Sequence, residues 1–177
     1  VELLKQARMN EDVEVVHYAI TAMVELSKEY DYRLQKIEKK YTNDPDDPVI
    51  LEEYCDFLKE YLSQGFMEKQ MEQIYRNQYT QLLLKQLEQR VNLHTCVCLM
   101  ENLMVQRDFF LAEKILKIME QNWHRGEEYW IWKIRYLAER KMGKELKQSL
   151  QALKEEHIYL SSRGKEALGF WLDGSKK

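Results

Sequence analysis

Both prolines of this 177-residue chain stand in one short segment, Thr42–Pro48, and the chain contains only six glycines. So few chain breaks cannot supply the closely spaced turns of a β-sandwich or a β-barrel. Leu, Glu, Gln, Lys and Met dominate the rest of the sequence, and all five favour helices. Hydrophobic residues make up 45% of the chain, which is enough for a packed core. The sequence therefore predicts an all-α fold.

Apolar residues recur at helical spacing on both sides of the proline segment. Asp47 is expected to cap the helix that follows, with Pro48 at its first position, and Gly65 to end that helix. Val13–Tyr41 is expected to form one long helix or two with a bend. The other helices are predicted at Val1–Met9, Pro48–Ser63, Phe66–Gln89, Asn92–Val105, Phe109–Gln121, Glu127–Lys141 and Lys144–His157, with a last helix from a cap at Ser161 to Leu172.

The predicted helices between residues 92 and 158 form two pairs that align at a shift of about 34 residues, the period of tetratricopeptide repeats. Stacked helix pairs of this kind share a core that one pair cannot make alone. We therefore expect a helical-repeat solenoid: a HEAT-like segment at 1–44, then an array at 45–177 with units near 48–90, 93–125 and 127–158 and a capping helix at 161–172. The aligned pairs are Ala112 and Leu146, Cys96 and Trp130, Leu103 and Leu137, Leu116 and Leu150, and Met119 and Leu153; Leu51, Tyr54, Leu58, Met67, Met71 and Ile74 are the matching positions of the first unit.

Motifs of catalysis are missing from the sequence. It contains no glycine-rich phosphate loop, no Gly-x-Ser-x-Gly and no His-Glu-x-x-His. Cys96 and Cys98 lack a second ligand pair at zinc spacing, so both cysteines and Cys55 are interpreted as buried thiols. We expect a protein that is not an enzyme and that has no cofactor or metal. Five aromatic residues are interpreted as packing between units rather than as a ligand cage: Trp123, Tyr129, Trp130, Trp132 and Tyr136.

Charge is distributed unevenly along the chain, although the formal net charge is only −3. Residues 11–60 hold 14 acidic and 6 basic residues, whereas residues 138–177 hold 6 acidic and 9 basic residues. This distribution indicates either ordinary solvated faces or a docking surface with oppositely charged ends. The near-neutral total argues against nucleic acid as a partner.

A partner protein is expected on the concave face, which the first helices of tetratricopeptide units line. Exposed apolar residues there would supply affinity, and charged residues would fix the register of the partner. The candidate partner-binding residues are Glu52, Asp56 and Lys59 in the first unit, His94, Val97 and Glu101 in the second, and Glu128, Ile131 and Arg135 in the third.

The segments Asn10–Ala19 and Asp31–Glu38, followed by the Asp-Pro break, resemble the cytoplasmic part of the PelE family. These are the tetratricopeptide-containing proteins of the Pel exopolysaccharide machinery. Weak repeat consensus, with Cys96 in place of the usual Trp, is the departure from that pattern.

The resemblance implies a scaffold without catalytic residues, at the cytoplasmic face of a bacterial inner membrane, with two membrane helices ahead of Val1. It implies protein partners: the cyclic-di-GMP receptor PelD, the glycosyltransferase PelF and the transporter PelG. An alternative interpretation is the peptide-sensing domain of a cytoplasmic transcriptional regulator, whose upstream segment would be a DNA-binding helix-turn-helix. The sequence predicts no oligomeric state.

Overall fold

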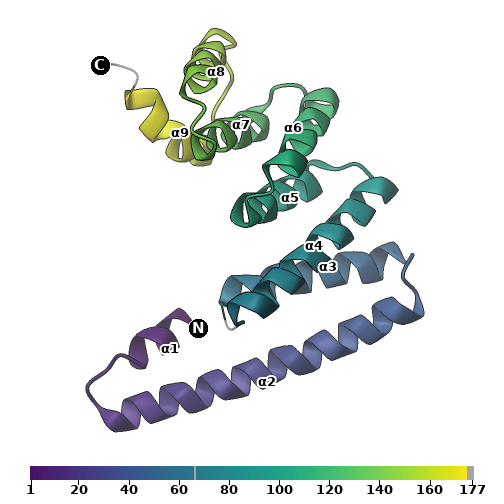
Figure 1. The fold of residues 1–177 in the computed structure, drawn as a ribbon, viewed down its shortest axis with the longest axis vertical. Coiled ribbons are helices and arrows are strands. Elements are labelled where there is room, and N and C mark those ends of the chain that lie inside the picture. Colours follow the sequence, from purple (N-terminus) through teal and green to yellow (C-terminus); the bar gives the residue numbers. More distant parts are fainter. Residues whose placement is uncertain (66, 175–177) are drawn as a thin grey trace. The chain divides into compact units, whose positions relative to one another are not determined.

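The computed structural model describes residues 1–65 and 67–174, and within them the backbone forms helices and no strand (Figure 1). This confirms the all-α prediction. None of the described helices is both long and apolar enough to cross a lipid bilayer. Two compact units, Val1–Gln89 and Arg90–Lys177, are described separately below. The helices are α1 (Glu2–Ala7), α2 (Val13–Asn43), α3 (Pro48–Gln64), α4 (Lys69–Gln89), α5 (Leu93–Gln106), α6 (Phe109–Trp123), α7 (Glu127–Glu139), α8 (Gly143–Glu155) and α9 (Ser162–Gly174).

The ends of α3 are fixed by the residues that the sequence suggested. The Asp47 carboxylate accepts hydrogen bonds from the backbone N–H groups of Val49 and Ile50, at 2.7 and 3.3 Å. Pro48 takes the first helical position, where its missing N–H leaves no bond unmade. Gly65 ends the helix in the left-handed conformation, with φ of 66°. α2 is a single helix, so the alternative of two helices with a bend is wrong.

In the unit Val1–Gln89, α3 packs against α2 on one side and α4 on the other, while α1 folds back along the first half of α2 (Figure 1). The second half of α2 buries Tyr30, Leu34 and Ile37. The Lys5 ammonium on α1 donates to the Gln64 carbonyl at the end of α3, at 3.0 Å. The buried residues of α3 and α4 are Leu51, Tyr54, Cys55, Phe57, Leu58, Tyr61, Leu62, Tyr79, Thr80, Leu82, Leu83 and Leu87.

A line of polar contacts crosses this unit. Tyr54 on α3 is fully buried; its hydroxyl donates to the Glu38 carboxylate on α2 at 3.2 Å and accepts from the Gln78 amide on α4. Burial raises the pKa of Tyr54 above the usual range, so the hydroxyl stays a donor. On the outer edge, Glu60 accepts from the Tyr30 hydroxyl and pairs with Arg33 at 3.2 Å. These bonds have preferred directions, so they fix the register of the three helices.

The first half of α4 differs from the prediction. Met71 and Ile74, expected on its buried stripe, are 44% and 55% exposed. The inward face passes instead through half-buried Tyr75, which the spacing allowed as an alternative to Ile74, and through buried Tyr79. The predicted helix start at Phe66 lies outside the described residues. The sequence predicts a boundary at residue 44 between a HEAT-like segment and a tetratricopeptide-like array. The helix contacts do not distinguish these two types of repeat, so this boundary stays a prediction.

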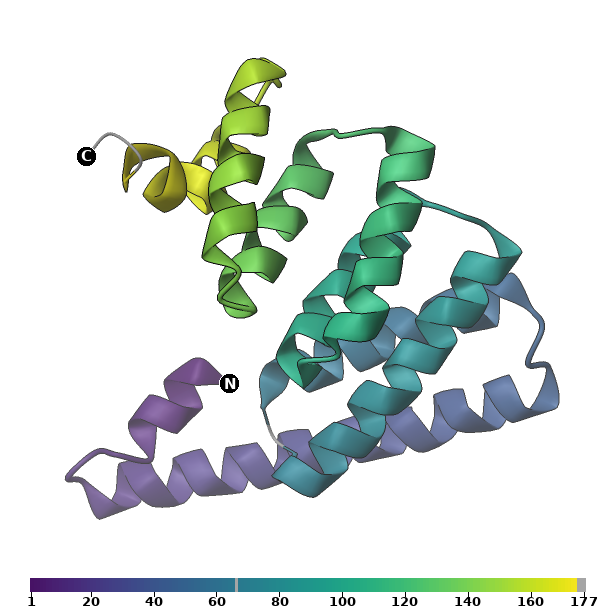
Figure 2. The ribbon, with the colours of Figure 1, turned by 45° about the horizontal axis from the view of Figure 1, so that its top comes forward.

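In the unit Arg90–Lys177, the hairpins α5–α6 and α7–α8 have the same turn 34 residues apart (Figure 2). Asp108 N–H bonds to the Leu103 carbonyl, and Met142 N–H bonds to the Leu137 carbonyl, at 3.0 and 2.9 Å. The residue before each, Arg107 or Lys141, is left-handed, with φ of 58° and 56°. This is the Schellman ending of a helix, here in two copies.

Burial also repeats at this interval. Cys96, Leu103, Leu116 and Met119 are buried, and so are their counterparts Trp130, Leu137, Leu150 and Leu153. In the remaining aligned pair Ala112 is buried and Leu146 is half-buried. The helix pairs therefore place equivalent residues in equivalent apolar positions.

The last helix, α9, packs on α7. Ser161, just before α9, donates its backbone N–H and its hydroxyl to the Glu127 carboxylate at the start of α7; the hydroxyl bond is 2.8 Å. Arg163 pairs with Glu128. Gly164 lies so close to Glu127 that a Cβ atom would stand 2.7 Å from the carboxylate, and Leu168 is fully buried. α7 thus contacts four other helices: α5, α6, α8 and α9.

Candidate partner-binding groove

Two of the predicted partner-binding residues, Glu101 on α5 and Arg135 on α7, line one groove of about 400 Å³. They occupy equivalent positions in the two hairpins, since they are 34 residues apart. Helical spacing adds Met104 and Val105 beside Glu101, and Trp132 and Glu139 beside Arg135. Val105 is 60% exposed, so the groove has an open apolar surface between its charges.

Two charged side chains of the groove, Arg135 and Glu139 on α7, make different kinds of contact. The Arg135 guanidinium lies over the Trp132 ring, with 4.8 Å between its carbon and the ring centroid. Trp132 itself is only 1% exposed, so it forms a rigid platform for this cation. Arg107 pairs with Glu139 across the groove at 3.7 Å, between side chains 70% and 55% exposed. Such an exposed ion pair is weak, so a charged group of a bound partner can replace one of its two members.

The other predicted residues of this unit are dispersed. His94 is exposed, and its Nε2 lies 3.5 Å from the Cys98 sulfur. Val97 is half-buried. Glu128 is held by Arg163 of α9 and is not presented to a partner in the groove.

Ile131 was predicted to be exposed, and this is wrong because its side chain is 2% exposed. Its aligned residue in α5, Val97, is half-buried, so the equivalent position is less covered in the first hairpin. The difference follows from the position of α7, which contacts four helices, α9 among them. The surface of α7 at Ile131 is covered by these neighbours.

The three candidates on α3 belong to the unit Val1–Gln89. Glu52 and Asp56 are exposed, and Lys59 is half-buried. Asp56 lies between α2 and α3, in a surface pocket of about 390 Å³ that Lys36 also lines. The ion pairs Arg33–Glu60 and Lys40–Glu53, at 3.2 and 2.9 Å, flank this pocket, so its charges already serve the contact between the two helices.

Sequence reasoning missed Met104, Val105, Trp132 and Glu139. The sequence could have indicated them, because each lies three or four positions from Glu101 or Arg135 and therefore on the same face of its helix. Four of the five residues of the aromatic cluster are buried, as the packing interpretation expected: Tyr129, Trp130, Trp132 and Tyr136 are at most 7% exposed, whereas Trp123 is half-buried. The three cysteines are buried as well, and burial raises the pKa of the Cys96 thiol to about 11.

Comparison of the chain with protein-family models, with curated proteins and with solved structures gave no match.

Proposed function

We propose that the unit Arg90–Lys177 binds a peptide segment of a partner protein in the α5–α7 groove, and that the protein is a non-enzymatic scaffold. One observation carries this proposal: equivalent residues of two successive hairpins, Glu101 and Arg135, line a single groove with an exposed Val105. Apolar surface supplies affinity in such a site, and charges of both signs set the direction and register of the bound segment.

The hairpins α5–α6 and α7–α8 are, in the same proposal, two tetratricopeptide-like units, with α9 as the cap. Support comes from the 34-residue interval between their helix starts, Leu93 and Glu127, and from the duplicated Schellman turns. In a repeat protein each unit contacts its neighbours only, and the first helices form a continuous binding surface. The contacts of α5 with α7 and of α7 with α9 fit that scheme.

A test of the groove begins with peptides selected from a displayed library on the whole chain. Arg135→Glu reverses the charge held over Trp132 and should weaken the selected peptides about tenfold, or ~1.4 kcal/mol. Lys165→Glu on α9 makes the same change of charge on an exposed position outside the groove and should leave affinity unchanged. Circular dichroism should show equal helical content in both variants. Equal affinity for both variants, or failure to select any peptide, would remove the proposal.

The class of partner is proposed from the sequence resemblance to PelE proteins alone: components of a membrane-associated exopolysaccharide synthase, PelD among them. A purified PelD protein offered to the immobilised chain tests this separately. Binding that Arg135→Glu weakens supports this class of partner. If PelD does not bind while selected peptides do, the Pel assignment is lost and the groove remains.

A further inference from the structure

α7 carries a second stripe of residues that faces away from the α5–α7 groove. Tyr129, Lys133, Tyr136 and Arg140 follow one another at intervals of four, three and four, so they share one face of the helix. They line a groove of about 470 Å³ whose walls come from α6 and α8. Figure 2 shows α7 between these two helices. Aromatic rings and cations therefore alternate along the floor of this groove.

Charged residues at both ends of the α7 stripe already have partners. At one end Arg125 bridges Glu120 and Glu156, at 2.8 and 2.9 Å. At the other end the Tyr136 hydroxyl accepts from Arg140 at 2.6 Å and donates to Glu113 at 3.4 Å. These contacts make the ends rigid and neutralise most of the carboxylates in the walls.

The middle of the groove holds a cation without a counter-charge. Lys133 is half-buried, and within residues 1–65 and 67–174 its ammonium group makes neither an ion pair nor a hydrogen bond. The aligned residue in α5 is Leu99, which is fully buried, so this repeat position is otherwise apolar. A partly desolvated ammonium group favours an anion beside it.

The lining of this groove also contains neutral hydrogen-bonding groups. Gln148 and Ser149 on α8 line the same groove and can donate an amide N–H and a hydroxyl. Trp130 also lines the groove, and among the described residues its buried indole N–H has no hydrogen-bond acceptor, as is also the case for Trp132. Glu145 is the remaining carboxylate of the lining; it is exposed, at the rim rather than on the floor. Gln148 and Ser149 can therefore hydrogen-bond an anion that pairs with Lys133.

We propose that the α6–α8 groove is a second binding site, which takes an extended peptide segment through an acidic side chain. The carboxylate of that side chain pairs with the Lys133 ammonium and accepts from Gln148 or Ser149. Its neighbouring apolar residues pack against the rings of Tyr129 and Tyr136. The segment is acidic rather than basic because Glu113 and Glu120 are already engaged and Lys133 is not.

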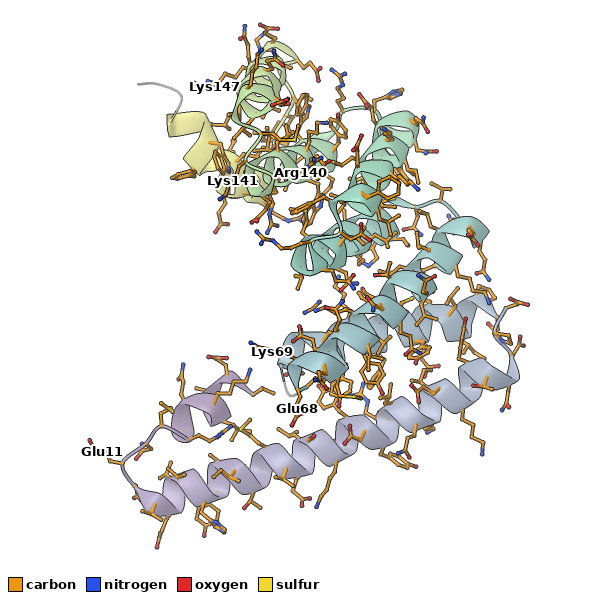
Figure 3. The ribbon with its side chains drawn as sticks, in the orientation of Figure 1. Glu11, Glu68, Lys69, Arg140, Lys141 and Lys147 are labelled. Atoms are coloured by element: carbon orange, nitrogen blue, oxygen red, sulfur yellow. The ribbon has the colours of Figure 1, made fainter. Side chains whose placement is uncertain are left out.

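The test uses two fluorescein-labelled octapeptides that differ at one central residue, Glu in one and Gln in the other, between leucines. Fluorescence anisotropy with the whole chain should show the Glu peptide binding at least about tenfold more tightly. Lys133→Met should abolish this preference, and Lys133→Arg should keep it because the charge is kept. The matched control is Lys147→Met, which removes the same charge from an exposed position on α8 outside the groove (Figure 3).

Two tryptophans report where a peptide binds, because Trp130 lines this groove and Trp132 lines the α5–α7 groove. In an NMR titration with the Glu peptide, the indole N–H resonance of Trp130 should move and that of Trp132 should stay. Equal affinity of the two peptides, an equal effect of Lys133→Met and Lys147→Met, or movement of Trp132 alone would each overturn the proposal. None of these outcomes affects the Arg135→Glu test of the α5–α7 groove, so the two proposed sites are tested independently.

Discussion

Both units have buried apolar cores, but in Val1–Gln89 a line of polar contacts also joins three helices, whereas in Arg90–Lys177 the buried apolar positions repeat every 34 residues. The first unit has Tyr54 bonded to two other helices and a row of ion pairs between α2 and α3. The second has Leu103 and Leu137 in equivalent buried positions. Apolar burial contributes more free energy per side chain, while hydrogen bonds select one register among several.

This difference matters for where binding sites can arise. In Val1–Gln89 the exposed charges between α2 and α3 pair with each other, so few remain for a partner. In Arg90–Lys177 the apolar positions carry the packing, and charged residues such as Arg135 and Lys133 are left over for recognition. In this unit the grooves therefore combine buried packing residues, Leu137 among them, with charged side chains such as Arg135 and Lys133.

Leu103→Ala should cause the largest loss of stability among the changes that test this comparison. Leu103 is 1% exposed, and truncating such a leucine costs about 2–5 kcal/mol because it leaves a cavity. Leu137→Ala, at the equivalent position, should cost a similar amount if the hairpins are true repeats. Urea unfolding followed by circular dichroism measures both. A difference of several kcal/mol between them would argue against equivalent packing.

Tyr54→Phe should cost less, about 1 kcal/mol, because it removes a hydroxyl and keeps the ring. Glu38 and Gln78 are only half-buried, so water can replace the lost partner. The same urea experiment applies, with Tyr32→Phe as a control on an exposed tyrosine of α2. A loss as large as that of Leu103→Ala would show that polar contacts dominate the stability of this unit.

Acidification should have the smallest effect on stability, and it should act on the unit Val1–Gln89, which contains Glu60. The Tyr30 hydroxyl and then Arg33 lower the pKa of Glu60. A carboxylate with a lowered folded-state pKa contributes stability above its unfolded pKa of ~4.3, and this contribution disappears as the pH falls through the folded-state value. Thermal unfolding at decreasing pH should therefore show a shallower decline for Glu60→Gln than for the natural chain. Parallel declines would exclude Glu60 as a contributor.

Much of the fold could be predicted because its signals are local. The Asp47–Pro48 cap, the Gly65 ending and the apolar spacing of α5 to α8 depend on residues a few positions apart. Arg135 and Glu101 could be paired in advance because a repeat converts sequence distance into spatial equivalence. Ile131 could not be placed correctly, since its burial depends on which helices surround α7. Met71 and Ile74 are exposed because Tyr75 and Tyr79 take the inward positions in this part of α4.

The length of α2 has a consequence for hydrogen exchange. Its second half buries Tyr30, Leu34 and Ile37, but in its first half Val13, Tyr18 and Val24 are 80%, 72% and 47% exposed. The short α1 packs along that first half (Figure 1), where Ala19 is the buried residue among those that the structure describes. Backbone amides there can open to solvent without disturbing the rest of the unit, since local openings cost less where few apolar contacts break. Amide protection should therefore rise steadily along one continuous helix, from the first turns of α2 to Ile37.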